Sequence, residues 1–132
     1  MAIKKILNES ELKAMNAENC PYEEMETNHY LLPIRDALNV LEGKWKIPIV
    51  ASLFYKTKRF KEISRDLDGI SDKVLSSELK DLESNKIISR TVFDSFPPRV
   101  EYAITEHGKS LALLIEEIMK WGQYHRKTII GK

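Results

Sequence analysis

The sequence predicts a mainly α-helical domain that carries a small β-hairpin, an α+β fold. Two helical segments flank a tight turn at Asp68 and Gly69. After Asn85 the apolar residues change from a helical period to a period of two, and a long amphipathic segment follows the two predicted strands. Helix-turn-helix, two-stranded hairpin and long helix, in this order, indicate a winged helix-turn-helix domain with flanking N- and C-terminal helices.

The size and composition of the chain indicate one globular domain. Its 132 residues can bury one core, and 42% apolar with 31% charged residues are typical of globular proteins. No apolar run approaches the roughly 20 residues that span a bilayer, and the first ten residues lack the apolar core of a signal peptide. We therefore expect a cytoplasmic protein without a membrane partner. With a single cysteine, an internal disulfide is excluded.

The chain is predicted to divide into an N-terminal helix and arm, residues 1–30, and a winged-helix domain, residues 31–128. Asn8 can cap a short helix because Glu11 follows three residues later, as in a capping box. Residues 16–30 are polar and show no sustained period, so we expect a loop or connecting arm there.

Two helices are expected to open the domain. The first is indicated by apolar residues at helical spacing, Ile34, Ala37, Leu38 and Leu41. Gly43 can end this helix. The second is indicated by Ile47, Val50, Ala51 and Phe54. Pro48 falls in its first turn, where a missing backbone N–H costs little. Trp45, just before it, is expected in the core rather than at a ligand.

The helix-turn-helix, the hairpin and a last helix follow. Ser71 is expected to cap the second helix of the motif, because its hydroxyl can accept from a backbone N–H. The strand-like runs IISRTVFDS and RVEYAIT are separated by Phe96, Pro97 and Pro98, and prolines fit a loop because they cannot donate to a sheet. Thr105 is expected to cap one long last helix. Its apolar side holds Leu111, Leu114, Ile115, Ile118, Met119 and Trp121.

The second helix of the motif, residues 71–84, carries four acids against two lysines. The two faces of this helix differ in composition, however, when the residues are placed at 100° steps around the helix axis. One side is apolar: Val74, Leu75, Leu79 and Leu82. The other is small, hydroxylic and basic: Lys73, Ser76, Ser77, Lys80 and Ser84. That side suits a helix entering the major groove of DNA, although a solvated polar face is the alternative. Glu78, near the apolar edge, needs a partner such as Arg65, or partial exposure.

Two basic segments flank this helix in the sequence. Residues 56–65 hold five cations, among them Lys58 and Arg59, against one acid, whereas the whole chain has a net charge of only +1. The hairpin adds Arg90 and Arg99. In a winged helix these segments lie close to one DNA surface, so we expect all four residues to contact DNA.

Ordered motifs run through residues 33–122: EGKWKIPIVASL, KRFKEISRDLDGISDKVLSSELKDLE, FPPRVEYAITEHGKSL and a final WG pair. They resemble the HxlR-type winged-helix transcriptional regulators of bacteria. The resemblance implies a homodimer that binds operator DNA, with the terminal helices building the dimer contact. It also implies DNA contacts from Lys73, Ser76, Ser77 and Lys80 of the recognition helix, from Arg59 and from Arg99 in the wing.

One departure from the family concerns a Cys-Pro pair that many members carry, whose cysteine serves several of them as a thiol sensor. At the corresponding place, 13 residues before the tryptophan of the GKW motif, this chain has Leu32 followed by Pro33. Cys20 and Pro21 form the same dipeptide 12 residues earlier. Redox sensing through Cys20 is therefore an alternative, which the surrounding glutamates disfavour because they oppose a thiolate.

The last helix is predicted to carry the dimer interface, at Leu114, Ile118, Trp121 and Tyr124. A domain this small offers little core for both terminal helices. The alternative is that these side chains cover their own domain.

No residue pattern indicates catalysis, a metal site or a cofactor. His29, His107 and His125 share no ligand-like spacing, and the chain has no nucleophile elbow or phosphate-binding glycine loop. The predicted function is a sequence-specific DNA-binding transcriptional regulator that acts as a homodimer on a palindromic or pseudo-palindromic operator. The alternative is a winged-helix protein–protein interaction module. A positive surface joining the basic segments favours the former, and a large exposed apolar patch the latter.

Overall fold

The computed structural model describes residues 27–131, and the chain divides into two compact units, residues 1–39 and 40–132. Helix α3 (Thr27–Leu41) contains Pro33 and is followed by Gly43 at φ +92°. The predicted arm was wrong at its end, because Thr27–Tyr30 is helical. These residues are mostly polar and carry no apolar period that could have revealed the helix. The short helix predicted near Asn8 lies outside the described residues.

The second unit contains the predicted helix-turn-helix. Helix α4 (Lys46–Leu53) is followed by α5 (Phe60–Asp66) and α6 (Asp72–Ser84). Gly69 lies in the turn between α5 and α6 with φ +92°, a conformation that a residue with a Cβ rarely adopts. Pro48 falls in the first turn of α4, as expected.

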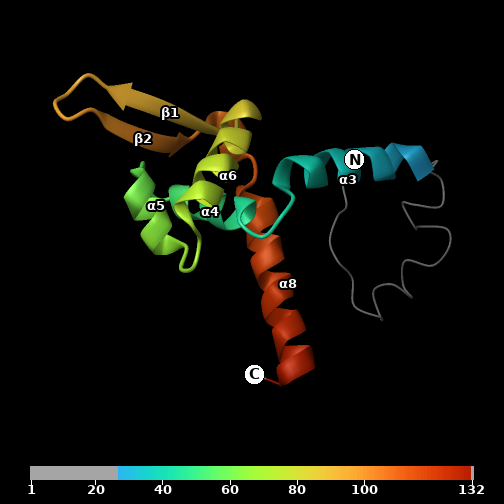
Figure 1. The fold of residues 1–132 in the computed structure, drawn as a ribbon. Helices are drawn as coiled ribbons and strands as arrows, with labels where there is room; N and C mark the ends of the chain where they lie inside the picture. The colour runs from blue at the N-terminus through green and yellow to red at the C-terminus, as the bar shows by residue number, and fades with distance from the viewer. Residues whose placement is uncertain (1–26, 132) are drawn as a thin grey trace. The chain divides into compact units, whose positions relative to one another are not determined.

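The predicted hairpin is also confirmed (Figure 1). Strands β1 (Ile88–Phe93) and β2 (Arg99–Ile104) pair antiparallel, with Ile88 opposite Ile104 and Phe93 opposite Arg99. Residues 94–98, including both prolines, form the loop. Lys58 adds a bridge to the hairpin, because its backbone N–H and carbonyl bond those of Tyr102 at 2.9 and 2.8 Å.

The single last helix predicted from Thr105 was wrong, because two helices follow the hairpin: α7 (Glu106–Lys109) and α8 (Ala112–Ile130). Thr105 does cap α7, since its hydroxyl accepts from the Gly108 N–H at 2.9 Å. After α7 the backbone forms a tighter turn with hydrogen bonds between residues three apart. The Ser110 and Leu111 N–H groups bond carbonyls three residues back, and the Ser110 hydroxyl also donates to the His107 carbonyl. Such local bonds compete with the α-helical pattern.

The core of the second unit lies between α4, α5, α6 and the base of the hairpin. Its buried residues are Ile49, Val50, Leu53, Ile63, Leu67, Leu75, Leu79, Leu82, Ile87, Ile88 and Tyr102. Trp45 packs against this cluster, as predicted. Val74, predicted on the apolar side of its helix, is instead 38% exposed, because it lies at the edge of the stripe in the first turn of α6.

Gly108 has no room for a side chain, which leads to a prediction about folding. A Cβ at this position would lie 2.2 Å from the Ile87 carbonyl oxygen and within 3 Å of two Ile104 side-chain atoms. Gly108→Ala is therefore expected to lower the free energy of unfolding by about 1–3 kcal/mol, measured by urea titration. Gly122→Ala is the matched control, because nothing lies within 4 Å of a Cβ there. Equal stability of the two variants would contradict this account.

Candidate nucleic-acid interface

Helix α6 presents the predicted contact side chains on a face that the rest of the unit leaves open. Ser71 caps the helix as predicted, because its hydroxyl accepts from the Val74 N–H at 3.2 Å. Leu75, Leu79 and Leu82 are fully or almost fully buried and hold the other face on the core. On the open face lie the four predicted residues, none of which hydrogen-bonds or ion-pairs through its side chain to a described residue: Lys73, Ser76, Ser77 and Lys80.

A charge cluster around the buried side chain of Lys46 ties α6 to α4. The Lys46 ammonium lies 2.5 Å from Glu78 Oε2 and 3.3 Å from Asp81 Oδ2, and its side chain is only 7% exposed. The expected partner of Glu78, Arg65, was therefore wrong. Burial alone would lower the pKa of Lys46, but the hydrogen bonds and charges of Glu78 and Asp81 outweigh it and raise the pKa above the usual 10.5. These ion pairs add to the buried leucines in holding one side of α6 against the rest of the unit.

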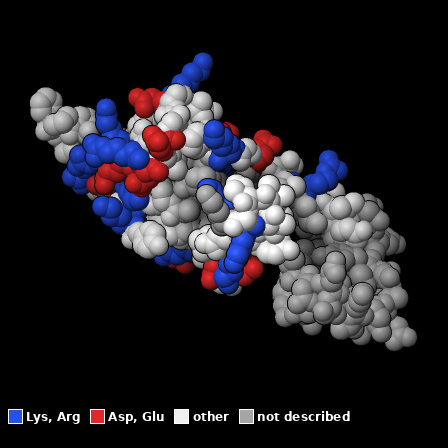
Figure 2. Space-filling model, turned by 90° about the horizontal axis from the view of Figure 1, so that it is seen from below, with Lys and Arg blue, Asp and Glu red and all other residues white. Residues whose placement is uncertain are grey.

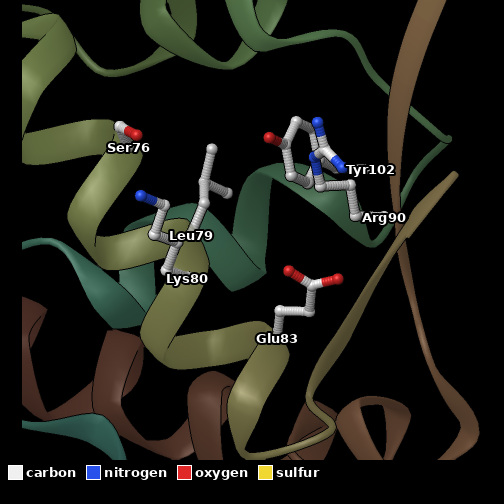
Figure 3. A pocket seen from close by; sticks show the side chains of 6 residues that line it. All are labelled: Ser76, Leu79, Lys80, Glu83, Arg90 and Tyr102. Carbon is white, nitrogen blue, oxygen red and sulfur yellow. The ribbon is translucent and has the colours of Figure 1, made fainter. Parts of the chain in front are cut away.

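A hollow of about 370 Å³ lies between α6 and the hairpin, and we call it the α6–hairpin hollow. Figure 3 shows the side chains that line it: Ser76, Leu79, Lys80 and Glu83 of α6, Arg90 of β1 and Tyr102 of β2. The four α6 residues follow a helical spacing, and Arg90 lies directly opposite Tyr102 in the sheet. The structure thus brings three of the predicted DNA contacts together: Ser76, Lys80 and Arg90.

Arg99 lies on the other face of the hairpin from Arg90. Side chains alternate along a strand, and Arg99 is paired with Phe93 whereas Arg90 is paired with Tyr102. The Arg99 guanidinium stacks 4.2 Å from the centre of the Phe93 ring, and its Nε lies 2.7 Å from Glu101 Oε2. These contacts hold the side chain at the start of β2 and partly neutralise it.

The basic cluster of residues 56–65 includes α5 and the segment before it. Figure 2 shows basic side chains gathered at the end of this unit that carries α5 and the hairpin, with acidic side chains among them. Lys58 forms an ion pair with Asp66 and its side chain is only 12% exposed, so it is less free to reach DNA. Arg59 is exposed and ion-pairs with no described residue. The Arg59 N–H donates to Glu62, and this bond lowers the pKa of Glu62.

The apolar side of α8 is largely uncovered. Leu111 and Ile115 pack against the core, but every residue from Glu116 to Gly131 is exposed. The four predicted dimer residues are 43, 45, 50 and 67% exposed: Leu114, Ile118, Trp121 and Tyr124. Trp121 stacks on His125 with ring centroids 4.9 Å apart. Figure 1 shows that the C-terminal turns of α8 leave the core of their own unit.

Redox sensing through Cys20 stays a prediction, because this residue lies outside the described part of the chain. Leu32, at the family's cysteine position, is 55% exposed on α3. Across residues 27–131, no three His, Cys, Asp or Glu side chains are grouped so that they could hold a metal ion. Over the same residues, no helix combines the length and the apolarity needed to cross a membrane.

Three residues of this region are not singled out by the sequence patterns. Lys46 begins the apolar run KIPIVASL, and a lysine in such a place signals an ammonium that needs carboxylates when it is buried. Glu83 is one of the four acids of its helix and Tyr102 lies within the strand-like run RVEYAIT, so neither stands out. Their meeting with Arg90 depends on how the hairpin packs, which no spacing in the sequence reveals.

Comparisons with known proteins agree with this geometry. Residues 40–129 match the family described as HxlR-like helix-turn-helix. The chain is 35% identical to the HTH-type transcriptional regulator YtcD of Bacillus subtilis over 107 residues, 81% of this chain and 85% of that protein. It is 36% identical to an HTH-type transcriptional regulator of Methanothermobacter thermautotrophicus over 103 residues, 78% of this chain and 79% of that protein.

Among solved structures, the chain is similar to the redox regulator HypR in its reduced form. The TM-score is 0.71 and the identity 32%, over 76% of this chain and 99% of that one. These matches confirm the predicted winged helix-turn-helix fold and the resemblance carried by the sequence motifs. The chain belongs to the HxlR-like helix-turn-helix family.

Proposed function

We propose that this chain, a DNA-binding transcriptional regulator, acts in the cytoplasm as a homodimer on a palindromic or pseudo-palindromic operator and has no enzymatic activity. The observation that carries the proposal is the open face of α6. It combines small hydroxyl side chains with two lysines that pair with no described residue. The opposite face of the helix is held by buried leucines and by the Lys46–Glu78 ion pair. A rigid helix with such a face suits the major groove.

The proposed DNA contacts fall into two groups. Ser76, Ser77, Lys73 and Lys80 lie on the recognition helix, where they can reach base edges or phosphates. Arg59, Arg90 and Arg99 lie outside it and supply positive charge toward the backbone. Lys58 also belongs to the predicted set. The ion pairs of Lys58 with Asp66 and of Arg99 with Glu101 support smaller contributions from these two residues.

The proposed dimer forms through α8. Its exposed apolar residues on one side of a projecting helix are what a second copy of the chain would bury. A two-fold axis then relates the two recognition helices, and their half-sites lie about one helical turn, roughly 34 Å, apart. The alternative, a protein interaction module, rests on the same α8 surface, but it leaves the open face of α6 without a role.

The test of the proposed function is binding to the DNA upstream of the protein's own gene. We expect affinity for this duplex to exceed affinity for a random duplex of equal length and composition by at least about 1,000-fold at physiological salt. Equal affinity for both duplexes, at several salt concentrations, would refute sequence-specific regulation.

Lys80→Ala is expected to weaken operator binding about tenfold without changing the thermal midpoint. If the ammonium contacts a phosphate, the slope of log K against log salt becomes shallower by about 0.9. Lys120→Ala is the control, because Lys120 lies on α8 and pairs there with Glu116 and Glu117. An affinity and slope equal to those of the control would remove Lys80 from the interface. Both quantities are measured by fluorescence anisotropy.

A further inference from the structure

Tyr102 places an unexplained hydroxyl beside the α6–hairpin hollow. The residue is only 9% exposed and belongs to the core cluster. Its hydroxyl nevertheless makes no hydrogen bond to any residue that the structure describes. A phenylalanine would pack equally well at this position. The hydroxyl itself is not enclosed, because among the described residues Arg99 Nε is the one buried side-chain polar atom without a hydrogen-bond partner. It therefore opens into the hollow, where a ligand can bond it.

The other polar groups of the hollow are also without partners among residues 27–131. Lys80 and Arg90 form no ion pair there, and the Ser76 hydroxyl makes no hydrogen bond. Two cations and two hydroxyl groups therefore line one hollow, together with a single acid, Glu83 (Figure 3). The buried side chain of Leu79 adds an apolar contact. This set of donors matches a group with negative charge and several acceptor oxygens, such as a phosphate.

DNA is the source of phosphate that this position favours. Ser76 and Lys80 belong both to the hollow and to the open face of α6, so an occupant of the hollow lies next to any duplex that α6 contacts. Backbone phosphates border the groove that a recognition helix enters. We propose that the α6–hairpin hollow binds a phosphate group of the DNA backbone, with Arg90, Lys80 and the Tyr102 hydroxyl as donors. This rests on the proposed function and adds Tyr102 and Glu83 to it.

The first test removes the donors one at a time. Arg90→Ala is expected to weaken operator binding about tenfold and to make the salt slope shallower by about 0.9. Tyr102→Phe keeps the packing and removes a neutral donor, so we expect binding about threefold weaker with an unchanged slope. The controls are Arg126→Ala on α8 and Tyr55→Phe, at a tyrosine that is 92% exposed. If both variants bind like their controls, the phosphate assignment is wrong.

Glu83 provides a test in which the expected change in operator affinity has the opposite sign. Its carboxylate opposes a phosphate in the same hollow, so Glu83→Gln is expected to strengthen operator binding about threefold. Glu42→Gln is the control, because Glu42 is an exposed acid with no partner among the described residues. Weaker binding by Glu83→Gln would overturn the proposal, since it would show that the carboxylate accepts from a base.

Inorganic phosphate, titrated at constant ionic strength, distinguishes the two sources of a phosphate group. If the duplex places a phosphate in the hollow, inorganic phosphate competes with it there, so millimolar phosphate should displace duplex more readily from the parent protein than from Arg90→Ala. Equal displacement from both proteins would overturn the DNA assignment, and NMR shifts with phosphate that need Arg90 would then identify a free phosphate compound as the occupant. If the parent protein binds no duplex, the proposed function fails. NMR shifts on addition of phosphate then test the phosphate site by itself. Shifts that disappear in Arg90→Ala would support the site, and the absence of shifts in the parent protein would refute it.

Discussion

Ile118→Glu is expected to convert the proposed homodimer into a monomer and to lower affinity for a two-half-site operator by about 100-fold or more. Ile118 is 45% exposed on the apolar side of α8. In a dimer interface the new carboxylate would be buried without a partner, which costs more free energy than a small interface can supply. A monomer then binds each half-site alone, so it loses the additional affinity that a dimer obtains by binding both half-sites at once. Sedimentation equilibrium and anisotropy on one- and two-half-site duplexes measure both effects.

The control for Ile118→Glu adds the same charge elsewhere on α8. Gln123 lies well around the helix from Ile118, so Gln123→Glu should leave the dimer and the operator affinity unchanged. An Ile118→Glu protein that remains dimeric would show that α8 does not form the interface. Loss of dimerisation with full affinity for the two-half-site duplex would instead show that the dimer is not needed for binding.

Lys46→Met is expected to lower the free energy of unfolding by about 3–5 kcal/mol, because it leaves the Glu78 carboxylate without its ammonium partner. Glu78 is 19% exposed in the side chain and lies 2.5 Å from Lys46 Nζ. Methionine keeps the apolar stem of the lysine, so the loss reports on the charge rather than on a cavity. Lys109→Met is the matched control. Its pair with Glu106 is exposed, at 56% and 90%, and such pairs contribute less than about 1 kcal/mol.

The double variant Lys46→Met with Glu78→Leu removes both charges together. We expect it to recover most of the lost stability, because replacing a buried ion pair by apolar side chains is often neutral. Urea titrations of the parent, the two single variants and the double variant complete the cycle. Additive losses would show that Lys46 and Glu78 do not interact in solution.

The pH dependence of the same pair follows from the raised pKa of Lys46. The ordinary value is 10.5 and the folded value lies above it. The stabilisation by the charged lysine is therefore fully present below pH 10.5 and is lost as the pH rises through the folded pKa. The difference in stability between the parent protein and Lys46→Met should thus stay constant through neutral pH and shrink at strongly alkaline pH. A difference that shrinks near neutral pH would contradict the shift.

Local residue patterns determined most elements of the second unit. The leucines of α6 at helical spacing, the Ser71 and Thr105 caps, Gly69 in the turn and the prolines between the strands act on neighbouring backbone. Their effect is therefore independent of what packs around them. The same local reasoning failed at the polar start of α3, where no apolar period marks the helix. It also failed at the break between α7 and α8, where local bonds of Ser110 compete with the helical spacing of the apolar residues.

Only the tertiary structure decided which charges meet. Glu78 pairs with Lys46, which precedes it by 32 residues, rather than with the nearer Arg65. Arg90 and Arg99 lie on opposite faces of one hairpin, and Arg90 joins Lys80, Glu83 and Tyr102 around one hollow. The sequence by itself determined the family, the helix-turn-helix and the polar face of the recognition helix. The pairing of distant side chains depends on how helices and hairpin pack, and no local period encodes that packing.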